Sequence, residues 1–243
     1  MEAFDRFDPA DPTASRFVDE DLNRLWDEAV LAGGRRSYEL RRARALRPLL
    51  DTVDVLLDLH SMLWPSDPLV LAGRTERARR FALDLGVPPL VVADEGHAGG
   101  RRMIDYRGFS EADGARIGLL VEAGAHWEAP TVAVMEATAA ALLRRCGVAA
   151  ADDEVLPPPP SPGAAAQRPR SAEVTRTVTA TGAGFAFVRS YRGGDVVAER
   201  NTLIALDGDT EIRTPHDHCL LVMPSLRTMP GHTAVRLARF VEG

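Results

Sequence analysis

The sequence lacks several features that would assign it to whole classes of protein. It contains no lysine, so all 29 basic residues are arginine, and 35 acidic residues outnumber them. The net charge of -6 gives no basic excess of the kind that marks a general nucleic-acid binder. The two cysteines, Cys146 and Cys219, are far apart and indicate neither a disulfide framework nor a cysteine metal site.

Long apolar runs are also missing. No stretch approaches the roughly 20 apolar residues that a membrane helix needs, and the opening MEAFDRFDPADP has no signal-peptide core. We therefore expect a cytoplasmic protein with no membrane contact. The 45% hydrophobic content over 243 residues is enough to bury a real core.

Proline is concentrated in one place and divides the chain. Residues 151–173, ADDEVLPPPPSPGAAAQRPRSAE, predict a linker, because four consecutive prolines cannot sit inside a helix or a central strand. We expect an α/β domain over residues 1–150 and a small all-β domain over residues 174–243.

The segments before the linker alternate between helical and strand-like patterns. Alternation of this kind predicts a mostly parallel or mixed sheet with helices on its faces. The expected helices are 21–30, 37–53, 75–86 and 129–147, and the expected strands are 53–59, 88–95 and 117–124.

Two residues near predicted strand ends are candidates for chemistry. His60 follows the apolar run VDVLLDL, and ligands gather at the carboxyl ends of strands in α/β sheets, so it could bind a metal or act as a base. Glu122 follows IGLLV and could be a general base, because an unpaired buried carboxylate is costly. The alternatives are a histidine that finishes a strand and a glutamate that reaches solvent.

The other histidines are weaker candidates. His126 lies four residues after Glu122 and could contact a substrate, or it could be a solvated loop residue. His216 and His218 have no obvious third ligand, which favours a structural role, and His97 lies in a glycine-rich loop.

The segment ASRFVDEDLNRLWDEA brings together Arg16, Asn23 and Arg24. Guanidinium groups suit a carboxylate ligand. The alternative is the charged first turn of an ordinary helix, which residue types alone favour, since Asp and Glu stabilise a helix N-terminus.

Three of these segments, RFVDEDLNRLW, DLHS and VEAG, together resemble the succinylglutamate desuccinylase/aspartoacylase family of zinc carboxypeptidase-like hydrolases. Their order agrees with the family pattern, and so does the spacing of 62 residues between His60 and Glu122. The α/β domain followed by a small β domain is also the family layout, so the resemblance covers most of the chain. It makes a site in the opening segment the favoured interpretation.

The resemblance implies a hydrolase of small N-acyl amino acids or related amides that binds one zinc ion. His60 would be a zinc ligand, and Glu122 would take the proton from zinc-bound water. Arg16 would stabilise the oxyanion, while Asn23 and Arg24 would hold the carboxylate of the substrate. His126 would be a further substrate contact.

The acyl group of the substrate is not identified by these motifs. Candidates to line its pocket are Trp64, Tyr106, Arg107 and the segment GAHWE at 124–128, and core packing is the alternative for them. The resemblance leaves open whether the chain forms homo-oligomers.

The chain departs from the family pattern in its zinc ligands. A catalytic zinc takes three protein ligands, and the family has two of them, a His and a Glu in an HGxE-type motif, before the Asn-Arg segment. None of the six histidines here is followed three residues later by glutamate. We therefore expect the catalytic domain to be N-terminally incomplete and, as written, poor in zinc and inactive.

Two alternatives to a truncated enzyme stay open. The chain could be a non-catalytic relative that binds carboxylates, or a subunit whose partner supplies the missing strands and ligands. A rearranged zinc site of His60, Glu122 and His126 is less favoured, because it would use the general base as a ligand.

Overall fold

The computed structural model describes residues 5–8, 10–11, 14–97, 99–158 and 169–241. Residues 1–4 lie outside them. The chain divides into two compact units, one of residues 1–56 and 96–118 and the other of residues 57–95 and 119–243. The described residues contain no helix with the length and apolar character to cross a membrane.

The first unit is helical. Its described residues include the 3-10 turns η1 (Leu22–Arg24) and η2 (Met103–Asp105) and the α-helices α2 (Glu28–Ala32) and α3 (Tyr38–Leu50). The hydroxyl of Ser37 accepts the N–H of Leu40 and begins α3. Apolar side chains of α2, α3 and the 106–109 segment form its core around the fully buried Trp26.

The helix predicted over residues 21–30 is wrong. The side chains of Asp21 and Asp27 each cap the N-terminus of a short helix, so two short helices replace the single predicted one. Between the two, Leu25 forms a β-bridge with Arg101, and the N–H of Trp26 donates to the Arg101 carbonyl at 3.2 Å. A bridge to a distant segment replaces the helical hydrogen bonds here.

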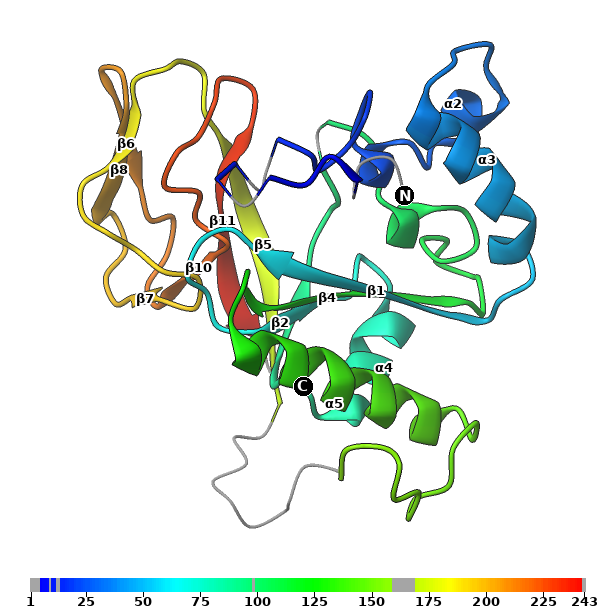
Figure 1. Cartoon of the computed structure of the whole chain (residues 1–243). Coiled ribbons are helices and arrows are strands. Elements are labelled where there is room, and N and C mark those ends of the chain that lie inside the picture. The colour runs from blue at the N-terminus through cyan, green and yellow to red at the C-terminus, as the bar shows by residue number, and fades with distance from the viewer. Residues whose placement is uncertain (1–4, 9, 12–13, 98, 159–168, 242–243) are drawn as a thin grey trace. The chain divides into compact units, whose positions relative to one another are not determined.

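An eight-stranded mixed sheet has the order β1-β4-β2-β3-β5-β11-β10-β7 (Figure 1). Parallel pairing joins β2 to β3 and β3 to β5, while antiparallel pairing joins β2 to β4 and the last four strands to one another. The strands are β1 (Val55–Met62), β2 (Leu69–Leu71), β3 (Leu90–Ala93), β4 (Ile117–Ala125), β5 (Arg170–Thr179), β7 (Val196–Val197), β10 (Cys219–Val222) and β11 (Thr233–Val241).

The strands β1 and β4 are longer than predicted. His60 was expected at the end of its strand, but β1 continues to Met62, and Glu122 lies three residues before the end of β4. Both candidate residues are therefore inside strands. Hydrogen-bonding neighbours of the sheet hold their backbone.

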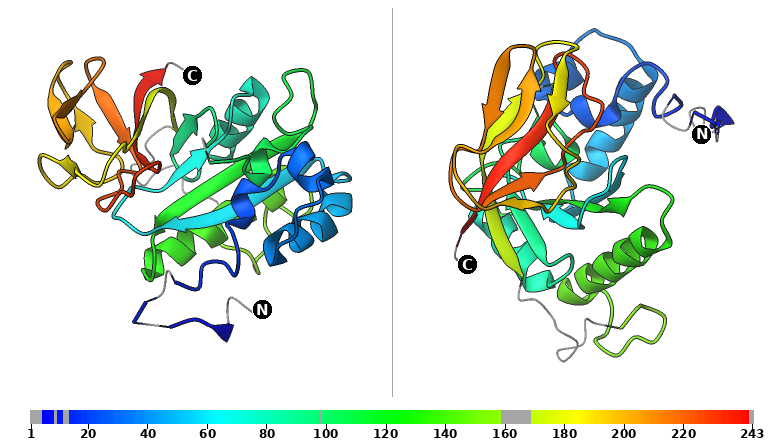
Figure 2. Two further views of the ribbon diagram at one scale, coloured as in Figure 1. Left: turned by 90° about the horizontal axis from the view of Figure 1, so that it is seen from above. Right: turned by 90° about the vertical axis from the view of Figure 1, so that its left-hand side faces the viewer.

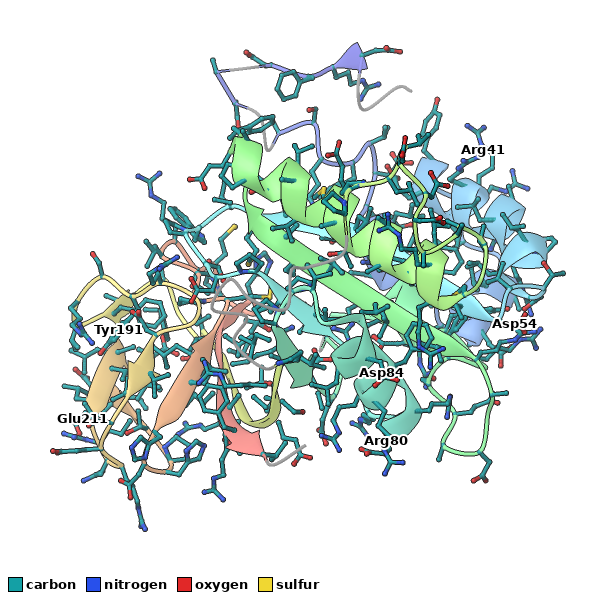
Figure 3. The ribbon with its side chains drawn as sticks, turned by 90° about the horizontal axis from the view of Figure 1, so that it is seen from below. Arg41, Asp54, Arg80, Asp84, Tyr191 and Glu211 are labelled. Carbon is teal, nitrogen blue, oxygen red and sulfur yellow. The ribbon has the colours of Figure 1, made fainter. Side chains whose placement is uncertain are left out.

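Two helices of the second unit, α4 (Glu76–Leu85) and α5 (Ala129–Arg145), are confirmed. Gly86, the predicted stop of α4, has the left-handed backbone (φ 73°) that ends a helix without strain for glycine. Arg80 and Asp84 lie on the exposed side of α4, as Figure 3 shows.

The separate small β domain predicted for residues 174–243 is not confirmed. β5 pairs in parallel with β3, so strands on both sides of the predicted linker share one sheet, and β5 and β11 lie side by side in Figure 2. Only β6 (Phe185–Phe187), β8 (Leu203–Asp207) and β9 (Thr210–Arg213) form a second sheet among the described residues. Residues 159–168 of the linker lie outside the described residues, and β5 begins at Arg170.

Candidate functional site

The opening segment gathers its polar side chains on Asp21. Nη2 of Arg16 donates to Oδ2 of Asp21 at 3.0 Å, and Nη2 of Arg24 lies 3.8 Å from the same oxygen. Oδ1 of Asp21 accepts the backbone N–H of Asn23 at 2.9 Å. The structure thus brings together Arg16, Asn23 and Arg24 around a carboxylate that was not among the predicted site residues.

The side chain of Asn23 is buried and its orientation is set by the backbone. Its amide Oδ1 accepts the N–H of Met103 at 2.7 Å, and only 7% of the residue is exposed. Met103 begins η2, 80 positions along the chain. This contact fixes the plane of the amide group next to Arg24.

A hollow of about 560 Å³ lies beside this cluster, within the first unit. Arg24 lines it, and the other charged lining residues are three carboxylates and two arginines: Glu20, Asp21, Asp27, Arg35 and Arg101. Gly100 is at its edge with a φ of 137°, and a side chain there would collide with the Arg24 carbonyl. Glycine is therefore required where the loop crosses Arg24.

Glu39 holds the loop that precedes this cluster. Its carboxylate accepts the backbone N–H groups of Val18, Asp19 and Glu20 at 2.6, 3.1 and 3.3 Å. In return Oδ2 of Asp19 accepts the N–H of Tyr38, the first residue of α3, at 2.8 Å. Burial raises the pKa of the Glu39 carboxyl, but these backbone donors outweigh burial, so its pKa is lowered from 4.5.

We expect the loop to loosen in acid through Glu39. Because folding lowers this pKa, the stabilisation is fully present above 4.5 and is lost as the pH falls through the lower folded value. The amide protons of Val18, Asp19 and Glu20 should therefore titrate together below pH 4.5 in an NMR titration. Glu39→Gln should remove this common transition. The exposed control Glu28→Gln should keep it, and a transition that survives Glu39→Gln would contradict the assignment.

The other predicted residues lie in the second unit. The ring Nε2 of His60 is 3.0 Å from Oδ1 of Asp58, two residues earlier on β1. Alternate strand residues share a face, which places both side chains on one side of β1. Glu122 is only 7% exposed, and its Cα pairs with that of Leu69 on β2.

His126 joins the ends of the two strands. Its backbone N–H donates to the Met62 carbonyl at 2.8 Å, and its Nδ1 lies 2.6 Å from the hydroxyl of Ser61. The turn into α5 depends on Gly124, whose φ is 134°, since a Cβ there would come within 2.7 Å of the Thr131 hydroxyl. His126 is therefore held in position at this strand end by its backbone and by its side chain.

Comparison with known proteins gives a result for structure only. No protein-family model matches the sequence, and no curated protein matches it. A succinylglutamate desuccinylase from Vibrio parahaemolyticus matches in structure with a TM-score of 0.65 and 19% identity, over 96% of this chain and 70% of that one. A succinylglutamate desuccinylase/aspartoacylase from Rhodobacter sphaeroides matches with a TM-score of 0.64 and 18% identity, over 98% and 71%.

A third structure, the product-bound ectoine utilization protein from Ruegeria pomeroyi, has a TM-score of 0.59 and 15% identity over 96% of this chain and 69% of that one. The chain has the desuccinylase/aspartoacylase fold. The mixed sheet predicted for a member of this group is thereby confirmed. This chain spans about 70% of the length of the matched desuccinylase.

The residues of this chain that the structure describes do not provide the ligand set of a catalytic zinc. Among them, no three His, Cys, Asp or Glu side chains are grouped to hold a metal ion. A catalytic zinc needs three protein ligands, and the ring of His60 lies 3.0 Å from the carboxylate of Asp58. The buried His216 is occupied on both ring nitrogens, by the Thr175 hydroxyl at 2.9 Å and the Asp217 carbonyl at 3.0 Å.

Tyr106 and Arg107, candidates for an acyl pocket, belong to a different network. The hydroxyl of the buried Tyr106 donates to Asp51 at 2.8 Å, and Arg107 lies 3.3 Å from the same carboxylate. Burial raises the pKa of Tyr106, and the hydrogen bond to Asp51 raises it further. The Tyr106 side chain thus packs at the end of α3 and does not line the hollow.

The sequence interpretation also missed a buried ion pair. Nε and Nη2 of Arg102 donate to the two carboxylate oxygens of Asp105 at 2.7 and 2.9 Å, and 3% of the Arg102 side chain is exposed. The pair closes η2, which carries the N–H that fixes Asn23. Its only sequence signal is the spacing of three residues between opposite charges.

Proposed function

We propose that this chain carries the substrate-binding and proton-transfer residues of a hydrolase that removes the acyl group from a small N-acyl amino acid. The observation that carries the proposal is Glu122, a carboxylate held at 7% exposure inside the sheet of a desuccinylase/aspartoacylase fold. A buried carboxylate is kept only where its surroundings compensate its charge, and a glutamate in such a position is a candidate for proton transfer.

Carboxylate recognition is assigned to the first unit. Arg24 faces the hollow, Asn23 has a fixed amide, and Arg16 is held on the same aspartate as Arg24. Guanidinium groups bind carboxylates through charge-assisted hydrogen bonds, often in pairs. These residues suit the free carboxylate of an N-acyl amino acid.

Proton transfer is assigned to Glu122. As a general base it would take a proton from the attacking water, and then give a proton to the amine nitrogen as the C–N bond breaks. Arg16 would stabilise the negative charge that develops on the carbonyl oxygen. The described residues do not group three side chains that could hold a zinc ion.

The gathering of Arg16, Asn23 and Arg24 on Asp21 beside the hollow also supports a second candidate. In it the chain is a carboxylate-binding protein without catalysis, and Arg16, Asn23 and Arg24 keep their role. A subunit completed by the ligands of a partner chain is a variant of the first candidate.

Calorimetric titration with N-acetyl amino acids tests the binding assignment. We expect Arg24→Ala to weaken binding by about tenfold or more, since a hydrogen bond to a charged group contributes about 1.5–3 kcal/mol. Arg213→Ala is the matched control, because its guanidinium pairs with Glu211 in the second sheet. If Arg24→Ala binds as tightly as the control, the assignment fails.

Release of free amino acid, followed by mass spectrometry with and without added zinc, separates the two candidates. Turnover that is lost in Glu122→Gln supports the hydrolase. Binding without turnover supports the carboxylate-binding protein. If no N-acyl amino acid binds, both candidates are wrong.

A further inference from the structure

Two large apolar side chains are exposed where β1 and β4 end. Leu63 is 51% exposed and Trp127 is 73% exposed. Each follows directly one of the residues joined by the hydrogen bond from the His126 N–H to the Met62 carbonyl. The carboxyl ends of strands are where α/β folds bind their ligands, and these two side chains lie within five residues of His60 and Glu122 along the sequence.

The backbone of Trp127 is held in an unusual conformation. Its φ is 67°, a left-handed value that is rare for bulky residues. Such strain persists where the surrounding structure enforces it, and it is concentrated at functional sites. The ring of Trp127 lies edge-on to that of His126, with the ring centroids 5.9 Å apart, and Nδ1 of His126 lies 2.6 Å from the Ser61 hydroxyl.

The charges beside these side chains disfavour an anionic ligand. Residues 63–68 and 126–128, which follow the two strands, contain no lysine or arginine, whereas Asp67 and Glu128 are acidic. Arg192 approaches from another loop, but its Nη2 lies 2.8 Å from Asp67. A second carboxylate, such as that of a succinyl group, would meet two acidic residues and one arginine here, so the local charge does not favour it.

We propose that Leu63 and Trp127 contact the acyl group of the substrate, and that this acyl group is uncharged, apolar and larger than acetyl. This inference rests on the proposed function and specifies its substrate class. An acyl chain laid on the two side chains buries apolar surface on both partners, which favours binding by about fourfold for each buried methylene.

The test compares acetyl, succinyl and phenylacetyl derivatives of one amino acid, chosen as the one whose acetyl derivative binds most tightly. We expect the phenylacetyl derivative to bind at least tenfold more tightly than the acetyl derivative, and the succinyl derivative to bind most weakly. Trp127→Ala should abolish the phenylacetyl advantage, so that the phenylacetyl and acetyl derivatives bind the variant about equally. Leu49→Ala, which removes a 60% exposed leucine on α3, is the control and should keep it.

Leu63→Arg provides a second test that does not depend on losing a contact. It places a cation beside the acyl group and should raise affinity for the succinyl derivative by about tenfold, the effect of one charge-assisted hydrogen bond. The inference is overturned if succinyl binds most tightly to the wild type, or if Trp127→Ala keeps the phenylacetyl advantage. If acetyl and all other derivatives fail to bind, the proposed function falls as well.

Discussion

Trp26→Ala is expected to lower the free energy of unfolding by about 3–5 kcal/mol. The Trp26 side chain is fully buried and is the largest in the core of the first unit. It packs against residues of α2 and α3 and meets Tyr106 edge-on at a centroid distance of 6.0 Å. Alanine would leave a cavity that the two short helices cannot close.

Two further variants make the Trp26 result specific. The indole Nε1 is buried with no hydrogen-bond partner among the described residues, so Trp26→Phe removes an unsatisfied donor and should cost less than alanine. Trp127→Ala, at a 73% exposed site, should change stability by less than about 1 kcal/mol. Urea unfolding followed by circular dichroism measures all three, and equal effects of Trp26→Ala and Trp127→Ala would contradict the packing argument.

Arg102→Ala is expected to lower the free energy of unfolding by about 1.5–3 kcal/mol, because it removes the charge-assisted hydrogen bonds of a buried guanidinium group. The Arg102 guanidinium is 3% exposed and binds both oxygens of Asp105. The pair closes the turn whose Met103 N–H fixes Asn23. We therefore also expect weaker binding of N-acetyl amino acids by Arg102→Ala.

The adjacent arginine gives a matched control for this prediction. Arg101 is 55% exposed and pairs with Asp27 at 3.3 Å, so Arg101→Ala should cost no more than about 1 kcal/mol. Unfolding curves of the two variants should therefore differ widely, although the substitutions are one residue apart. An Arg102→Ala protein as stable as Arg101→Ala would show that the buried pair contributes little.

Local signals predicted the longer helices well. Ser37, Thr75 and Gly86 lie at helix ends in the structure, where their side-chain hydroxyls or a left-handed backbone satisfy terminal groups. Such signals act within a turn of the chain, so one sequence is enough to read them. The same rule failed at residues 21–30, because the bridge from Leu25 to Arg101 is not a local interaction.

Pairing between distant strands was the main feature that the sequence did not reveal. The strand β2 has three residues, too few for a periodic pattern, and it was not predicted. The proline-rich segment 151–173 follows α5 and overlaps the first residues of β5, and it does not show that β5 returns to β3. A linker composition describes the connection and carries no information on what the connected strands pair with.

For the candidate site, the sequence analysis identified the side chains that gather, but not the residues that hold their segment in place. Arg16, Asn23 and Arg24 are close in sequence, so their gathering needed only a short turn. Glu39 and Met103, which hold that segment, come from elsewhere in the chain. The roles of His60, Glu122 and His126 stay predictions, and the Glu122→Gln variant above tests that of Glu122.

The parallel pairing of β3 with β5 has a consequence for synthesis of the protein on the ribosome. Leu90 of β3 pairs with Arg170 of β5, so 80 further residues must be synthesised before β3 can pair with β5, its second neighbour in the sheet. During that interval its edge, in the apolar run LVVA, is open to pairing with other chains. Nascent chains that stall before residue 170 should be the form most prone to aggregate and most dependent on chaperones.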